Sequence, residues 1–387
     1  MQDNSIQTSE VLKTSEVYLL NIVPYLCQMQ FSQIPNAAIS KEADRPMMQK
    51  EVYPVSDALQ QYLEQSKKDT ELPLTYKELL HYEYTNAIKD DKGKHTHWER
   101  VVYDKVLLSA LKKKLVLLYG LLKNETGIEI DSIDFCEFAN SMPFRINITH
   151  TKNKNKDLFY IKSADASRIY GLLLEQLLTN NHINFLYHQN TLVEEHIDGV
   201  PGDDFLETLY TLNEGQKKLL AAEFISFNES CFARLLGDMR SYNFVVVQNK
   251  NAQKPFTIKA IDFDQQCYEG RLNLYLPQFY KENYRYVQLV TAYFGDEAIG
   301  TIQKQERSQM ATLLLKNREP LTALLAAMTK EEISENYKVV SLRRELNQYH
   351  HTHVFSHNKT MGTLVKQQLA QLLTPYLPPG SQLFASI

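Results

Sequence analysis

Three side chains with oxygen atoms lie at the ends of two strands that the sequence predicts. Asp238 and Asn243 come just before the apolar run 244–248. Asp262 comes at the end of a second run, 256–262, and a polar, proline-containing segment separates the two runs. This pattern predicts a β-hairpin. Because the start of one antiparallel strand lies beside the end of the next, we expect the three side chains to converge.

Such a cluster suits a magnesium ion and the phosphates of a nucleotide. Mg²⁺ binds few protein oxygens and keeps its other positions for water and phosphate. Asn243, Asp262 and the nearby Asp264 are the predicted metal ligands, and Asp238 is a carboxylate that can take a proton from a substrate. The alternative is two surface turns, because turns favour Asp and Asn whatever their function.

The spacing Asp-x-x-x-x-Asn, followed by an Asp at the end of a strand, resembles the catalytic loop of the protein-kinase-like superfamily. The sequence Gly-Asp at the start of the loop and the sequence Ile-Asp-Phe-Asp after it are more similar to aminoglycoside phosphotransferases and HipA than to eukaryotic protein kinases. No His-Arg pair precedes Asp238, and Asp264 stands where Asp-Phe-Gly would have its glycine. The resemblance covers residues 132–315 and implies a two-lobed α+β fold. A small antiparallel sheet over 131–198 would be followed by a mainly helical lobe over 199–387.

Alternating residues predict strands at 133–139, 144–151 and 158–162. The resemblance implies that Lys162, on the third of these strands, contacts the nucleotide phosphates. A helix follows, and its Glu175 lies among leucines. A buried carboxylate needs a cation, and Lys162 is the partner that we expect. The alternative is that Glu175 and Arg168 belong to the exposed edge of an ordinary amphipathic helix.

Three further features concern the same predicted site. The resemblance implies a hinge where backbone groups of Glu195, His196 and Ile197 would meet the edge of an adenine. Arg240 either holds a transferring phosphoryl group or pairs with a neighbouring carboxylate. The loop 140–143 departs from the family, because it has no glycine to close over phosphates and its Pro143 lacks an N–H.

The resemblance implies a phosphotransferase that uses ATP and Mg²⁺ to phosphorylate a hydroxyl of a small molecule or a protein. Transfer of AMP by the same residues is a second interpretation. The third is a catalytically inert pseudokinase or interaction module. The missing glycines favour this third interpretation, and the complete set of Asp238, Asn243 and Asp262 opposes it.

The composition limits the other function classes. The chain of 387 residues has a net charge of −4 and a pI near 6.3, which argues against a protein that mainly coats nucleic acid or an anionic membrane. Its start lacks the basic and apolar segments of a signal peptide, and no apolar run reaches the ~18 residues of a membrane span. We therefore expect a cytoplasmic protein that does not bind membranes.

Residues 1–130 carry no motif that we assign to a function. Their apolar spacing predicts helices at 11–31, 55–67, 76–84 and 98–122, with a loop at 89–97. We expect a helical N-terminal domain that could bind a protein partner. Between residues 287 and 373 the spacing predicts helices again.

Overall fold

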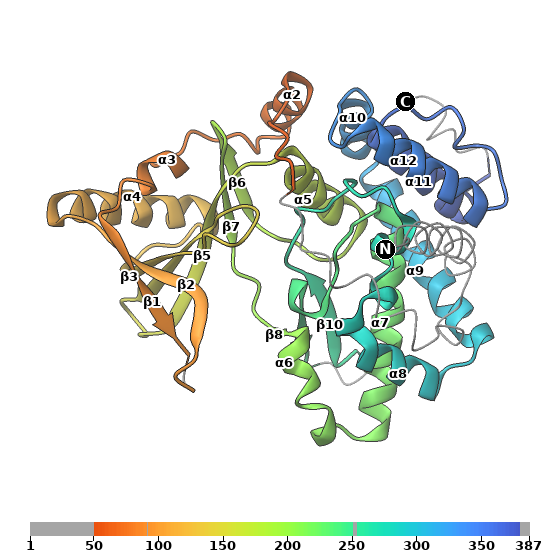
Figure 1. Cartoon of the computed structure of the whole chain (residues 1–387), viewed down its shortest axis with the longest axis horizontal. Helices are drawn as coiled ribbons and strands as arrows, with labels where there is room; N and C mark the ends of the chain where they lie inside the picture. Colours follow the sequence, from red (N-terminus) through yellow and green to blue (C-terminus); the bar gives the residue numbers. More distant parts are fainter. Residues whose placement is uncertain (1–49, 91, 251–253, 380–387) are drawn as a thin grey trace, which may run out of the picture.

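The structure is a computed structural model and describes residues 50–90, 92–250 and 254–379. A sheet lies on one side of the molecule and a group of helices on the other, with the helix α5 between them (Figure 1). The predicted α+β class is therefore confirmed. The helix predicted at 11–31 lies outside the described residues.

The first sheet has seven antiparallel strands in the order β1-β2-β3-β4-β5-β7-β6. The strands are β1 (Tyr84–Lys89), β2 (His95–Val102), β3 (Ile128–Phe135), β4 (Phe144–His150), β5 (Lys156–Ser163), β6 (Phe185–His188) and β7 (Thr191–Glu195). β3, β4 and β5 follow one another both in the chain and in the sheet. The helix α5 (Ala166–Leu178) then leads from β5 to the β6–β7 hairpin.

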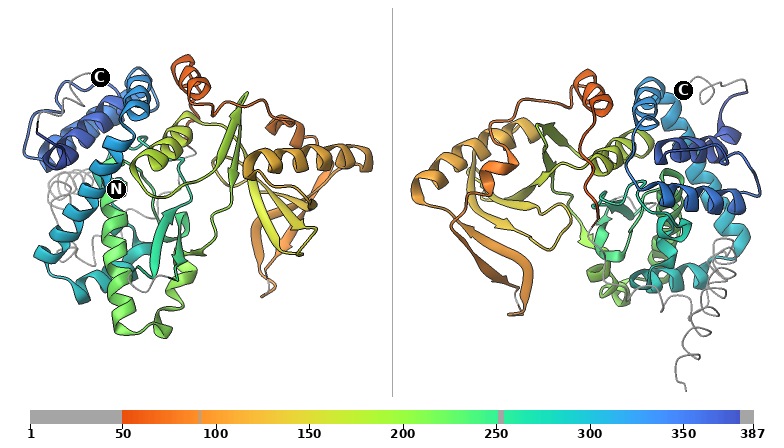
Figure 2. Two further views of the ribbon diagram at one scale, coloured as in Figure 1. Left: turned by 180° about the vertical axis from the view of Figure 1, so that it is seen from behind. Right: turned by 45° about the horizontal axis from the view of Figure 1, so that its top comes forward.

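The two faces of this sheet differ because successive side chains of a strand point to opposite sides. Phe159 and Ile161 are fully buried in a core shared with the helix α4 (Lys105–Lys123). α4 runs along this face of the sheet (Figure 2). Tyr160 and Lys162 alternate with these residues along β5, so they lie on the opposite face.

The rest of the chain is mainly helical and contains a second, three-stranded sheet in the order β10-β9-β8. Its strands are β8 (Val200–Pro201), β9 (Phe244–Gln248) and β10 (Phe256–Ala260). The helices are α6 (Gly202–Leu206), α7 (Glu214–Arg234), α8 (Tyr284–Tyr293), α9 (Asp296–Lys316), α10 (Arg318–Met328), α11 (Asn336–Tyr349) and α12 (Met361–Leu373). β9 and β10 form the predicted hairpin, in which Phe244 pairs with Ala260.

We expected the part of the chain before β3 to be helical, but it also contains the strands β1 and β2. The predicted helix at 55–67 is present as α2 (Asp57–Gln65), but the one at 76–84 is only the single turn α3 (Tyr76–Leu79). Residues 84–102 form β1 and β2 for most of their length. β3 continues across residue 130, where we expected a domain boundary.

The helix predicted at 98–122 begins only at Lys105. Asp104 caps it by accepting hydrogen bonds from the amides of Val106 and Leu107, at 2.9 and 3.1 Å. Trp98 and Val101 belong to β2 instead. Their spacing fits a helix and a strand equally well, so periodicity could not decide between the two.

In the part of the chain that the structure describes, no helix has both the length and the hydropathy to cross a lipid bilayer. Cys136, Cys231 and Cys267 are buried free thiols.

Candidate functional site

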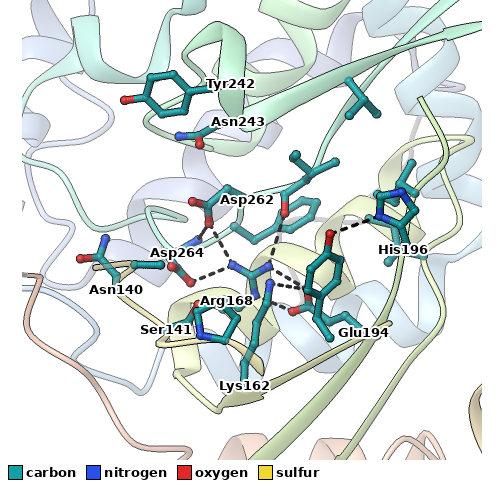
Figure 3. A pocket seen from close by; sticks show the side chains of 18 of the residues that line it. Asn140, Ser141, Lys162, Arg168, Glu194, His196, Tyr242, Asn243, Asp262 and Asp264 are labelled. Carbon is teal, nitrogen blue, oxygen red and sulfur yellow. Dashed lines mark hydrogen bonds and ion pairs between the residues drawn. The ribbon is translucent and has the colours of Figure 1, made fainter. Parts of the chain in front are cut away.

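A cavity of about 470 Å³ lies between the first sheet and the β9–β10 hairpin (Figure 3). Eight predicted site residues line it: Lys162, Glu195, His196, Ile197, Asp238, Asn243, Asp262 and Asp264. Arg240 and Glu175 are not part of the lining. The structure thus brings together the sheet residues and the hairpin residues, as predicted, although their chemical roles remain predictions.

The turn after α7 brings Asp238 and Asn243 together. Asp238 takes a left-handed conformation with a φ of 55°, which is uncommon for a residue other than glycine. Its amide donates hydrogen bonds to the carbonyl of Leu274 at 3.2 Å and to Tyr280 Oη at 2.9 Å, and these bonds hold the turn. Asn243 Nδ2 donates to the carbonyl of Asp238 at 2.7 Å. The amide nitrogen of Asn243 therefore faces the turn, and its Oδ1 remains as an acceptor.

The carboxylate of Asp238 has the properties of a base that works near neutral pH. Burial raises its pKa to about 6, although the guanidinium of Arg240 acts in the opposite direction. Arg240 Nε donates to Asp238 Oδ1 at 2.7 Å, and its Nη1 lies 2.9 Å from Glu282 Oε1. The structure therefore shows Arg240 paired with carboxylates, which is one of the two roles considered for it.

Lys162 pairs with a glutamate, but not with the one that we expected. Its Nζ lies 2.8 Å from Glu194 Oε2 on the neighbouring strand β7, and both side chains are buried. Glu175 instead forms an ion pair with Arg234 of α7 and accepts a hydrogen bond from Asn181 Nδ2 at 2.9 Å. The predicted pair of Lys162 and Glu175 is therefore wrong.

The rise of the helix explains the error. Glu175 lies seven residues beyond Arg168, which places it about 10 Å farther along α5. Lys162 is close to the beginning of α5, because only a short connection separates β5 from the helix. Arg168 lies at the level of Lys162, whereas Glu175 lies farther along the helix and contacts Arg234 of α7.

Arg168 is the central residue of the site (Figure 3), although the sequence did not predict this role. Only 1% of its side chain is exposed. Its Nε and Nη2 donate to the two oxygens of Glu194 at 2.5 and 2.7 Å. Its Nη1 lies 2.9 Å from both Asp262 Oδ1 and Asp264 Oδ1.

One sequence signal could have revealed this role. Arg168 lies in the first turn of a mainly apolar helix, where the helix dipole disfavours a cation. A cation in that position needs nearby carboxylates, and Asp262 and Asp264 were available in the predicted site.

The charges around Arg168 do not balance. The two cations Lys162 and Arg168 meet three carboxylates, those of Glu194, Asp262 and Asp264. Burial alone would raise the pKa of Glu194, but Arg168 and Lys162 outweigh it and hold the pKa at about 2. Burial and the neighbouring Asp264 raise the pKa of Asp262. An additional cation beside Asp262 would therefore be stabilised.

The oxygen atoms at this point fit a hard divalent cation. Asn243 and Asp262 supply amide and carboxylate oxygens, which Mg²⁺ prefers, and both line the cavity. The third predicted ligand, Asp264, also lines the cavity, but its carboxylate is paired with Arg168 and its side chain is only 7% exposed. The described residues hold no group of three or more His, Cys, Asp or Glu side chains arranged to bind a metal. A cation held by Asn243 and Asp262 would thus depend on water or a ligand's oxygens for its other positions.

The loop between β3 and β4 covers one end of the cavity. Phe138, Asn140, Ser141 and Pro143 line the cavity from this loop. Its ends are joined by a hydrogen bond from the amide of Cys136 to the carbonyl of Pro143, at 3.1 Å. The loop without glycine therefore lines the same cavity as Lys162.

The predicted hinge residues lie at the end of β7, and Glu195 is the last residue of this strand. The Glu195 side chain pairs with Lys123 Nζ at 2.6 Å. His196 Nδ1 lies 3.3 Å from Tyr160 Oη, and burial lowers the pKa of this histidine. Because their side chains have these partners, Glu195 and His196 would meet a ligand mainly through backbone groups.

No protein-family model matches this sequence, and a search of curated proteins finds no significant match.

Proposed function

We propose that this protein is an ATP- and Mg²⁺-dependent phosphotransferase with a two-lobed, protein-kinase-like fold. One observation carries the proposal: Lys162 from the sheet and Asp238, Asn243 and Asp262 from the hairpin line a single cavity. They occur along the chain in the order that the resemblance requires. The cavity volume of about 470 Å³ lies within the range of roughly 300–1,000 Å³ that small-molecule sites occupy.

Each residue has a role that its contacts support. Glu194 orients Lys162, whose ammonium group would contact the phosphates. Asn243 and Asp262 would hold Mg²⁺, which neutralises charge on the transferring phosphoryl group when bound. Asp238 would accept the proton of the acceptor hydroxyl. Because phosphoryl transfer needs little covalent work from the protein, positioning and charge stabilisation would dominate.

We also propose a cellular location and binding partners for the protein. The buried free cysteines fit a reducing compartment, so we place the protein in the cytoplasm. Its partners would be a nucleotide and an acceptor that carries a hydroxyl group. A protein partner for the N-terminal region remains a prediction.

Nucleotide binding is the first expected result. With ATP at one hundred times its dissociation constant, and with Mg²⁺ present, the free energy of unfolding should rise by about 2.7 kcal/mol. The measurement is thermal unfolding with and without ATP and Mg²⁺. The Asp262→Ala protein, which lacks a proposed metal ligand, should lose the Mg²⁺-dependent part of the shift.

Two outcomes would contradict the proposal. Absence of a shift with any nucleotide would favour the inert interaction module. If the nucleotide binds, the mass of the acceptor product decides between the two transfer reactions. An increase by one AMP instead of one phosphate would contradict phosphoryl transfer.

The rate should depend on pH through Asp238. Its pKa of about 6 lies above the ordinary value of 3.8, and the reactive form is the deprotonated one. kcat/KM should therefore rise with pH up to about 6 and then level off, and at lower pH it should fall about tenfold per pH unit. The measurement is kcat/KM between pH 4.5 and about 8. The residual rate of Asp238→Asn should lack this dependence, and a flat wild-type profile would exclude Asp238 as the base.

A further inference from the structure

We infer that Arg168 takes the place of a second divalent cation, so that the site binds one metal ion together with its nucleotide. This inference rests on the proposed function. Protein kinases hold two Mg²⁺ ions with the corresponding aspartate and asparagine. Here Arg168 already contacts Asp262, the carboxylate that two ions would share, and the nearby Asp264.

The contacts of Arg168 resemble those of a bridging cation. The single nitrogen Nη1 lies 2.9 Å from Asp262 Oδ1 and 2.9 Å from Asp264 Oδ1. The other side of the guanidinium is fixed by both oxygens of Glu194. Arginine does not lose its proton in proteins, so this positive charge is permanent.

The remaining oxygens are enough for one ion. Asp262 Oδ1 is occupied by Arg168 and by the amide of Asp264, which lies 3.0 Å away. The Asp264 side chain is only 7% exposed, whereas that of Asp262 is 35% exposed. Asp262 therefore presents its second oxygen to the cavity, beside Asn243. Asp264 stays with Arg168 and is hardly accessible to a second ion.

The position of α5 keeps Arg168 in place. A Cβ atom added to Gly171 would lie 2.8 Å from the Cβ of Phe263, so the helix contacts the segment between the two aspartates closely. At the start of α5, Asp165 accepts a hydrogen bond from the amide of Arg168 at 3.3 Å and forms an ion pair with Lys50 at 2.6 Å. A second metal ion would have to displace a buried, well-held cation.

The test is the number of Mn²⁺ ions bound in the complex with a non-hydrolysable ATP analogue. Electron paramagnetic resonance of free Mn²⁺ during a titration counts the bound ions without any enzymatic turnover. We expect one ion per protein. Two ions per protein would overturn this inference and leave the proposed function standing. If neither the analogue nor Mn²⁺ binds, both proposals fail together.

A variant tests whether Arg168 is the reason for this stoichiometry. Arg168→Met removes the cation from Asp264 and from Oδ1 of Asp262. The number of bound Mn²⁺ ions should therefore rise from one to two. The matched control is Arg307→Met, because Arg307 also pairs with a buried glutamate, Glu229, at 2.6 Å but does not line the cavity. It should still bind one ion.

A folded Arg168→Met protein that binds only one ion would overturn the role of Arg168. Thermal unfolding shows whether the variant is folded. If it is not, the wild-type count alone decides the inference.

Discussion

Asp238→Asn is expected to lower the rate of phosphoryl transfer by about 10²–10⁴-fold and to leave nucleotide binding in place. Asparagine has nearly the same shape as aspartate and can still accept the hydrogen bond from Arg240, but it cannot take a proton. The measurement is the formation of phosphorylated product from ATP, together with the nucleotide-induced thermal shift.

The control for this variant is Glu282→Gln. Glu282 is the second carboxylate bound to Arg240, so its replacement disturbs the same arginine without changing the proposed base. Its rate should stay close to that of the wild type. Turnover in Asp238→Asn equal to the wild-type value would show that Asp238 is not the base.

The second large effect is a loss of stability that should distinguish Glu175, the predicted partner of Lys162, from Glu194, the partner in the structure. Glu175→Gln should lower the free energy of unfolding by about 3–5 kcal/mol, because it leaves the charge of Arg234 buried without its partner. Both side chains of this pair are only 1% exposed. Nucleotide affinity should hardly change, because Glu175 does not line the cavity. The measurements are urea unfolding and nucleotide titration.

Glu194→Gln is the comparison within the site. It removes the carboxylate that orients Lys162 and Arg168, so we expect weaker nucleotide binding. The double variant Glu175→Met with Arg234→Met should regain most of the lost stability, because apolar side chains of similar size often replace a buried ion pair without loss. If Glu175→Gln weakens nucleotide binding as much as Glu194→Gln, the assignment of the two glutamates is incorrect.

The local structure around the site could be predicted from the sequence. Alternation placed Lys162 on the correct strand, and the hairpin of β9 and β10 followed from two β-rich runs separated by a polar turn. These features depend on residues close together in the chain. The convergence of Asp238, Asn243 and Asp262 followed from the geometry of that hairpin.

The choice of ionic partners could not be predicted in the same way. Glu175 and Glu194 are both acidic residues that follow Lys162, and only the offset along α5 decides which one it meets. Arg168 was considered only in the alternative of an exposed helix edge, because periodicity does not show which residues surround a helix. The strand β2 was missed for a related reason, since Trp98 and Val101 fit both spacings and only the pairing with β1 and β3 makes them a strand.

The shared carboxylate of Glu194 has a thermodynamic consequence. Lysine and arginine side chains each lose up to ~2 kcal/mol of conformational freedom when they are fixed in one orientation. Here Glu194 fixes both Lys162 and Arg168 as the chain folds. An arriving anion would therefore find the two cations already ordered, and the entropic cost of immobilising them would count against protein stability rather than against ligand affinity.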